Sequence, residues 1–287
     1  MAPVTANAIA TINRLAPGRT FLGLGTGNTA MRLMGQPPMK IAEFAEYLRV
    51  VRGLLDGRRV DYTYRGRTAP IELMMREFDF YALEPRIPLY ASGFGPRAMA
   101  LAGEVGDGLV FSIPRVPTVE AALKHVREGA ARAGRSLDGF HTCALTPVVV
   151  LEPGEALNSE RVVREYGPAI LASVHYAYDK WMRNGGDPPP FMEPIWKRYC
   201  ELMDDVPPHL RHLRLHDSHY AFVREDEAPL VTEELVRAVA LVGTAGELIE
   251  RIRDLERQGL SQLMFLPTVV NQYRLVETFS RQVMAKL

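Results

Sequence analysis

The sequence predicts an α/β protein whose short strands form a parallel sheet, either open or closed into a barrel. Two observations support this prediction. Short apolar runs alternate along the chain with amphipathic stretches of helical periodicity. The runs are also nearly continuous in apolar character, as expected of parallel strands that are covered on both faces. Strand–helix alternation of this kind builds parallel sheets. The predicted strands are residues 20–25, 88–92, 108–112, 141–151 and 261–267.

Three longer amphipathic stretches are predicted to be helices. Residues 41–55 carry a stripe of apolar side chains at helical spacing, and residues 119–133 carry a similar one. Residues 245–258 form the third, with Thr244 as the expected N-cap and Gly259 as the expected stop. Each helix lies between predicted strands, as a parallel arrangement requires.

Two segments interrupt the alternation. Residues 56–85 contain RVDYTYRG and predict a hairpin-like excursion. Residues 152–231 are rich in aromatic residues and proline, and they are too apolar for a linker. We expect them to form a helical insertion that covers one end of the barrel. Residues 1–287 are then one domain with one excursion and one insertion.

Composition narrows the class of protein. A hydrophobic share of 47% supports a sizeable core, and 34 Lys and Arg residues balance 34 Asp and Glu residues. This balance leaves no electrostatic footprint for nucleic acid. No apolar run approaches the roughly 20 residues needed to span a bilayer, and the N-terminus lacks a signal-peptide pattern. Cys143 and Cys200 form no redox or metal motif. We therefore expect a cytoplasmic protein with neither a membrane nor a nucleic acid as partner.

The first candidate site follows the predicted strand at residues 20–25. Thr26 and Asn28 offer hydrogen-bonding side chains, and Gly27 lets the backbone approach a ligand closely. In α/β barrels the active site lies at the carboxyl ends of the strands, where these residues fall. An ordinary tight turn between strand and helix is the alternative.

The second candidate site closes the predicted strand at residues 88–92 and opens a helix at residues 96–103. Backbone N–H groups at a helix start favour an anion, and an arginine there adds a formal positive charge. The segment matches neither the P-loop nor the dinucleotide fingerprint. We expect a phosphate cradle, with a capped turn as the alternative. Its residues are Ser92, Gly93, Phe94, Gly95, Pro96 and Arg97.

Four histidines form the third candidate. In a helix, His209, His212, His216 and His219 would fall on nearly one face, so a zinc site is conceivable. Arginines stand among them and no HExxH core occurs, so we predict no metal. His216 and His219 are the candidate catalytic residues, as a proton donor or a substrate contact. A purely structural role is the alternative.

Four segments, in order, resemble luciferase-like monooxygenases and their relatives, the deazaflavin-dependent methylenetetrahydromethanopterin reductases. They are VTANAIATINRLAPGRTFLGLGTGNTAMRLMG, IAEFAEYLRVVRGLLDGRRVDYTYRG, PLYASGFGPRAMALAGEVGDGLVFS and LVGTAGELIERIRDLERQGLSQLMFLP. The resemblance covers most of the chain outside residues 152–231, and it implies a (β/α)8 TIM barrel.

The resemblance also implies a cofactor. Gly93, Phe94, Gly95, Pro96 and Arg97 would hold its phosphate, and Thr26, Gly27 and Asn28 would line the flavin pocket. We expect a monooxygenase that uses reduced FMN and oxygen on a small organic substrate, with a separate flavin reductase as partner. The alternative is a hydride-transferring reductase or dehydrogenase that uses the deazaflavin coenzyme F(420).

One departure from the family bears on activity. Members normally have three strands before the one at residues 20–25, whereas one predicted helix precedes it here. We therefore expect an N-terminally incomplete barrel, begun at an internal methionine of a longer protein or completed by a partner. Uncovered strand edges would favour a homo-oligomer. A non-redox barrel enzyme for a phosphorylated substrate, and an inactive fragment, are further alternatives.

Overall fold

The computed structural model describes residues 1–113, 116 and 118–287, and its strands and helices confirm the α/β class. The chain divides into two compact units. The first contains Met1–Asn28, Pro38–Phe111 and Glu120–Cys143. The second contains residues 29–37, the described part of residues 112–119, and Ala144–Leu287.

The strands are β1 Leu22–Leu24, β2 Val60–Tyr64, β3 Arg67–Ile71, β4 Leu89–Ser92, β5 Gly108–Phe111, β6 His141–Leu145, β7 Val148–Leu151, β8 Leu241–Thr244 and β9 Gln262–Met264. The α-helices are α1 Ala2–Leu15, α2 Asn28–Leu33, α3 Ile41–Leu55, α4 Pro96–Val105, α5 Val119–Arg132, α6 Glu160–Asn184, α7 Glu193–Asp204, α8 Arg211–Arg214, α9 Glu233–Val239, α10 Ala245–Arg257 and α11 Gln272–Gln282.

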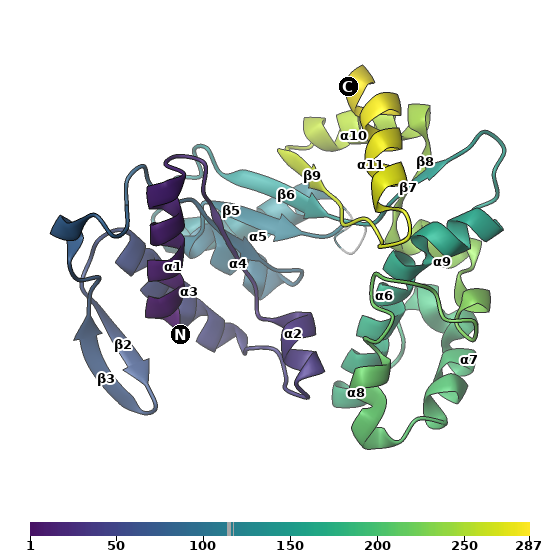
Figure 1. Ribbon diagram of the computed structural model, residues 1–287, viewed down its shortest axis with the longest axis horizontal. Helices are drawn as coiled ribbons and strands as arrows, with labels where there is room; N and C mark the ends of the chain where they lie inside the picture. Colours follow the sequence, from purple (N-terminus) through teal and green to yellow (C-terminus); the bar gives the residue numbers. More distant parts are fainter. Residues whose placement is uncertain (114–115, 117) are drawn as a thin grey trace. The chain divides into compact units, whose positions relative to one another are not determined.

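A parallel sheet forms the centre of the first unit. β1 pairs with β4 and β4 pairs with β5, each in parallel, and β6 follows β5 in the sheet order. α1 and α3 pack side by side (Figure 1). Ala2, Ala6 and Ala10 are fully buried on α1. Because these alanines recur every four residues, they present a flat stripe that lets α1 approach Val51 and Leu54 of α3 closely.

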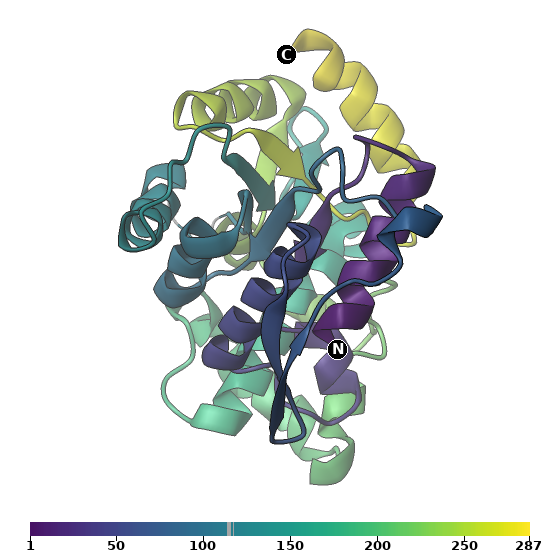
Figure 2. The ribbon, with the colours of Figure 1, turned by 90° about the vertical axis from the view of Figure 1, so that its left-hand side faces the viewer.

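The first unit also contains the predicted hairpin, which extends outward beside α3 (Figures 1 and 2). β2 and β3 are antiparallel, with Tyr64 opposite Arg67. Arg65 and Gly66 connect them with φ angles of 51° and 76°. Two successive residues in the left-handed region match the twist of the flanking strands, which explains the tight connection.

The second unit is mainly helical around a short parallel pair. β7 and β8 pair in parallel, and α9, α10 and α11 pack against this pair. The segment that was expected to be a helical insertion contains α6, α7 and α8, which gather together in Figure 1. The aromatic residues there are largely core: Tyr178 and Tyr199 are buried, and Trp181 and Trp196 pack against the same cluster.

Two strand predictions need correction. Residues 141–151 form two strands rather than one, because Thr146 and Pro147 separate β6 from β7. Pro147 has no N–H for a strand ladder, and its carbonyl accepts the Leu241 N–H at 2.9 Å, where the pairing with β8 begins. β8 itself was not predicted, because its four residues directly follow the apolar run of α9 and read as a continuation of that helix.

The helix predictions are confirmed within a few residues. α3, α5 and α10 lie where the periodicity predicted them, and α4 begins at Pro96 as expected. Thr244 caps α10 in a capping box with Glu247, and Gly259 has φ +98° just beyond the helix. Among the residues that the structure describes, no helix has both the length and the apolar character needed to cross a bilayer.

Candidate functional site

The loops after β1 and β4 leave the same edge of the sheet, because the two strands are parallel neighbours. Thr26 and Gly27 follow β1, Asn28 begins α2, and Ser92 ends β4. A Cβ atom placed on Gly25 would lie 3.4 Å from the Ser92 Cβ, so the two loops touch where they begin. The structure thus brings the first two groups of predicted site residues together in the first unit.

The loop after β4 turns tightly into α4. A Cβ atom on Gly93 would lie 2.4 Å from the Ala98 Cβ, so only glycine lets the strand end lie against the helix start. Gly95 is the N-cap residue and Pro96 the first helical residue, as predicted. No side chain within the described residues caps this helix start. Pro96 has no N–H and the Ala98 N–H donates to the Gly95 carbonyl at 3.0 Å, so the Arg97 N–H is the backbone group of this helix start that an external acceptor can meet.

The exposed side of this loop has the properties of an anion site. Gly95 and Arg97 are exposed, and a Cβ atom on Gly95 would meet nothing within 4 Å. Arg97 takes part in no ion pair with any residue in the described part of the chain. Phe94 is 40% exposed and adds a ring beside the cradle. An uncapped helix start, open space and an unpaired guanidinium together fit a phosphate group.

His216 and His219 lie in the second unit, where a chain of polar side chains meets them. The Tyr176 hydroxyl on α6 lies 2.6 Å from the Thr29 hydroxyl and 3.0 Å from His219 Nε2. The ring of His219 packs edge-on against Tyr176 and against His216, with centroids 5.3 Å apart in each case. We call Thr29, Tyr176, His216 and His219 the histidine cluster.

Burial keeps both histidines of the cluster uncharged. Desolvation, followed by the charges of His175 and Arg32, lowers the pKa of His216 to about 4. Desolvation and the neighbouring His216 likewise lower the pKa of His219 to about 4. At neutral pH each imidazole therefore carries one N–H donor and one acceptor nitrogen, and it does not hold a second proton.

A buried ion pair lies next to the cluster. Arg32 on α2 pairs with Asp179 on α6, and both side chains are at least nine-tenths buried. Arg183 pairs with the same carboxylate at 3.1 Å. The guanidinium carbon of Arg32 lies 5.9 Å from the centroid of the Tyr176 ring. Two guanidinium groups, those of Arg32 and Arg183, thus share the single carboxylate of Asp179.

The four histidines do not lie on one helix. The segment breaks into a 3₁₀ turn at Pro208–Leu210, the four-residue α8, and turns from residue 215 onward. Pro207 and Pro208 prevent a longer helix from starting earlier. His209 is exposed, whereas His216 is buried. Among the described side chains, no group of three or more His, Cys, Asp and Glu could hold a metal ion.

A separate hollow of about 240 Å³ lies at the amino ends of β4 and β5. Asp107 lines it, pairs with Arg86 at 2.7 Å and Arg52 at 3.4 Å, and accepts the Leu89 N–H at 2.9 Å. In α/β barrels this end of the strands supports stability rather than catalysis. We therefore assign the hollow a structural role and place the functional residues elsewhere.

Sequence reasoning did not predict Arg32, Tyr176 or Asp179 as site residues, and it included Thr29 only as part of the segment that follows β1. Thr29 and Tyr176 are 147 positions apart, and their contact depends on how α2 meets α6. A buried arginine facing a buried aspartate leaves no periodic trace in the sequence. The nearest available signal was the polar run that follows β1, of which Thr29 is the next residue.

The fold is that of an α/β protein with parallel strands, and the loops after β1 and β4 meet at the carboxyl edge of the sheet. The chain belongs to the luciferase-like monooxygenase family, whose model matches residues 2–262.

Two relatives match most of the chain. It is 27% identical to a 5,10-methylenetetrahydromethanopterin reductase of Archaeoglobus fulgidus, over 99% of this chain and 78% of the relative. It is 29% identical to an F420-dependent glucose-6-phosphate dehydrogenase of Beutenbergia cavernae, over 89% of this chain and 75% of the relative.

Solved structures share the fold at low sequence identity. The coenzyme F420-dependent tetrahydromethanopterin reductase of Methanopyrus kandleri has a TM-score of 0.64 and 19% identity, over 99% of this chain and 79% of that one. The oxygenating constituent of a Pseudomonas putida 3,6-diketocamphane monooxygenase, in complex with FMN, has a TM-score of 0.54 and 18% identity. The match covers 100% of this chain and 76% of that one. These neighbours bear out the luciferase-like barrel type of fold that the resemblance implied.

Proposed function

We propose that this protein is a deazaflavin-dependent oxidoreductase that moves a hydride between the coenzyme and a small organic substrate. The observation that carries the proposal is the similarity of nearly the whole chain to a methylenetetrahydromethanopterin reductase and to an F420-dependent dehydrogenase. This choice reverses the order of the two functions that the sequence suggested, in which the FMN monooxygenase came first.

The cradle after β4 would hold the phosphate of the coenzyme. Gly93 keeps the strand end against α4, the helix start offers the Arg97 N–H, and the Arg97 side chain adds a positive charge. Ser92 and Phe94 flank this position. When bound, a deazaflavin accepts or donates a hydride, and the protein's own part is to hold and orient it.

The loop after β1 would line the pocket for the ring system. Gly27 has φ +80°, a backbone conformation that leaves the loop close to any ligand at this edge. The Thr26 carbonyl accepts the Met39 N–H at 2.9 Å, which fixes the path of the loop. Thr26 and Asn28 keep side chains that can donate and accept hydrogen bonds.

His216 and His219 would contact the substrate. Because both are neutral at pH 7, they serve as hydrogen-bond partners of the substrate rather than as resident acids. His219 Nε2, the Tyr176 hydroxyl and the Thr29 hydroxyl form a continuous hydrogen-bonded chain, which would hold the His219 ring in place against the substrate.

An FMN monooxygenase is the second candidate, supported by the shared fold of an FMN-containing monooxygenase. Both functions need the same phosphate cradle, so the choice between them depends on the ring system that binds.

Titration of the purified chain with the deazaflavin coenzyme and with FMN, followed by fluorescence, tests the proposal. We expect tighter binding of the deazaflavin, and about tenfold weaker binding, or ~1.4 kcal/mol, in Arg97→Ala. Arg19→Ala is the matched control, because Arg19 is an exposed arginine on the amino side of β1. Tighter binding of FMN would favour the second candidate, and binding of neither would refute both.

A further inference from the structure

The hollow at the amino ends of β4 and β5 contains charged side chains that the proposed hydride transfer does not use. All of the residues that line it belong to the first unit. Its volume of about 240 Å³ is several times the roughly 30 Å³ that a water molecule occupies in the liquid. The hollow therefore has room for a small organic molecule rather than for a lone ion.

Arginine side chains converge on one carboxylate at this hollow. Arg86 lies 2.7 Å and Arg135 lies 3.6 Å from the same oxygen of Asp107, Oδ1. Arg52 lies 3.4 Å from the other oxygen, Oδ2, which also accepts the Leu89 N–H. Three guanidinium groups thus share the single negative charge of Asp107.

The neighbouring carboxylates do not cancel this excess of positive charge. Asp138 also lines the hollow, so among the described side chains three cations stand against two anions. Asp56 pairs with Arg52 too, but it has Arg58 as a further partner at 3.0 Å. The remaining positive charge matches a monoanion. A carboxylate carries one negative charge at pH 7, whereas a phosphate monoester carries about 1.5 to 2.

The two arginines that line the hollow are partly held in place before any ligand binds. Arg135 donates to the Gly103 carbonyl at 3.0 Å and to the Gly106 carbonyl at 2.9 Å, at the end of α4. Arg86 is 49% exposed and pairs with Asp107 through one nitrogen, Nη1, so its other N–H groups can face a ligand. Because the guanidinium groups are already positioned, an anion that binds them costs little side-chain entropy.

Aromatic rings form another wall of the hollow. The Tyr90 ring stacks between Phe21 and His141, with centroids 5.1 Å apart on both sides. A Cβ atom on Gly108 would lie 2.7 Å from the Tyr90 ring, so glycine is what lets this ring lie over β5. Tyr90 and Phe140 both line the hollow and offer ring surface to the organic part of a ligand.

We propose that this hollow binds a small organic carboxylate, with the carboxylate group on Arg86 and Arg135 and the organic group against Tyr90. The inference is independent of the proposed function, because it uses neither the cradle after β4 nor the loop after β1. It agrees with the structural role of the hollow, since a ligand that binds only the folded chain stabilises it.

Isothermal titration calorimetry of the unmodified protein with benzoate, at an ionic strength fixed with sodium chloride, tests the proposal. We expect saturable binding of one benzoate per chain. Benzamide has the same ring without the charge and should bind at least about tenfold more weakly. Inorganic phosphate at the same ionic strength should not displace benzoate. No binding of benzoate, equal binding of benzamide, or displacement by phosphate would each refute the proposal without any variant.

Variants locate the site. Arg86→Gln and Arg135→Gln should each weaken benzoate binding about tenfold. Arg132→Gln is the matched control, because Arg132 is an exposed arginine of α5 that pairs with Glu104 outside the hollow. Arg97→Ala should bind benzoate as the unmodified protein does, since the cradle lies at the opposite end of β4. A loss of binding in Arg97→Ala, with unchanged binding in Arg86→Gln and Arg135→Gln, would place benzoate at the cradle and overturn the assignment.

Discussion

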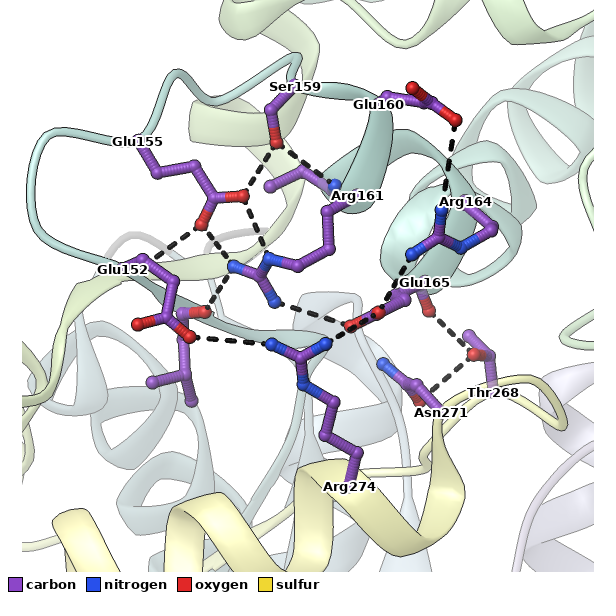
Figure 3. Close-up of polar contacts among 12 residues, drawn as sticks. Glu152, Glu155, Ser159, Glu160, Arg161, Arg164, Glu165, Thr268, Asn271 and Arg274 are labelled. Atoms are coloured by element: carbon purple, nitrogen blue, oxygen red, sulfur yellow. Dashed lines mark hydrogen bonds and ion pairs between the residues drawn. The ribbon is translucent and has the colours of Figure 1, made fainter.

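Arg161 shows how much one side chain can organise in this protein (Figure 3). Its guanidinium donates to both oxygens of Glu155, to Glu165 at 3.3 Å, and to the Val150 carbonyl at 3.1 Å. Arg274 reaches the same Glu165 at 3.1 Å from α11. This network therefore ties the start of α6 to β7 and to α11 within the second unit.

The first prediction concerns Glu155. Its hydrogen bonds with Arg161 lower its pKa from 4.5 to about 2. Since the folded pKa is below the unfolded one, the stabilisation is complete above about pH 4.5 and is lost as the pH falls toward 2. Glu155→Gln should lose about 1–2 kcal/mol at pH 7, a value discounted for nearby solvent, and much less at pH 3. Urea unfolding at both pH values measures this difference.

Glu160→Gln is the control for that experiment. Its side chain is 96% exposed and lies 3.8 Å from Arg164, so its removal should change the stability by less than about 0.5 kcal/mol. An equal loss of stability in Glu155→Gln at pH 3 and pH 7 would show that charge is not the cause.

At the scale of elements, glycines set the distance between α4 and α5. A Cβ atom on Gly103 would lie 2.0 Å from the Val126 carbonyl oxygen, and one on Gly129 would lie 1.8 Å from the Ala100 carbonyl oxygen. Each helix thus offers a glycine where the backbone of the other passes. α4 also packs against β4 and β5, so the loop at its start lies at the edge of the sheet.

The second prediction is that Gly129→Ala destabilises the protein by about 1–3 kcal/mol, because the two backbones must separate. Gly246→Ala in α10 is the matched control: a Cβ atom there meets nothing within 4 Å, and alanine is the better helix former. Thermal unfolding of both variants measures the effect. Similar melting temperatures for the two would mean that the α4–α5 contact tolerates a methyl group.

The whole molecule carries as many Lys and Arg residues as Asp and Glu residues, 34 of each. Many of them form exposed pairs, such as Arg127 with Glu120 and Arg281 with Glu277. Because the net charge is zero near pH 7, long-range repulsion between molecules is minimal there. The solubility of the protein is therefore expected to depend on pH through its net charge.

The third prediction is a minimum of solubility near the isoelectric point of 7.1, with higher solubility at pH 9, where the net charge is negative. Precipitation by polyethylene glycol across this range locates the minimum. Lys124→Glu on the exposed face of α5 should shift the minimum to lower pH. A minimum that stays in place would indicate that apolar contacts, not net charge, limit solubility.

Local sequence signals were enough for the elements that bury one face along a continuous run. The apolar stripe of α3, the Thr244 capping box of α10, and the Arg65–Gly66 turn are each decided within a few residues. The same holds for the cradle at Gly93–Arg97, because a strand end, two glycines and a proline fix its local path. These features follow from backbone geometry and side-chain periodicity, which sequence neighbours determine.

Tertiary structure decided what depends on residues far apart in the chain. The break at Pro147 and the short β8 are defined by their pairing with each other, not by their own periodicity. The histidine cluster exists because Thr29 and Tyr176 meet across 147 positions, and burial rather than residue type makes its imidazoles neutral. Contacts and desolvation of this kind arise only when separate segments pack together. The sequence alone therefore determined the individual helices, strands and turns, and tertiary packing determined the histidine cluster.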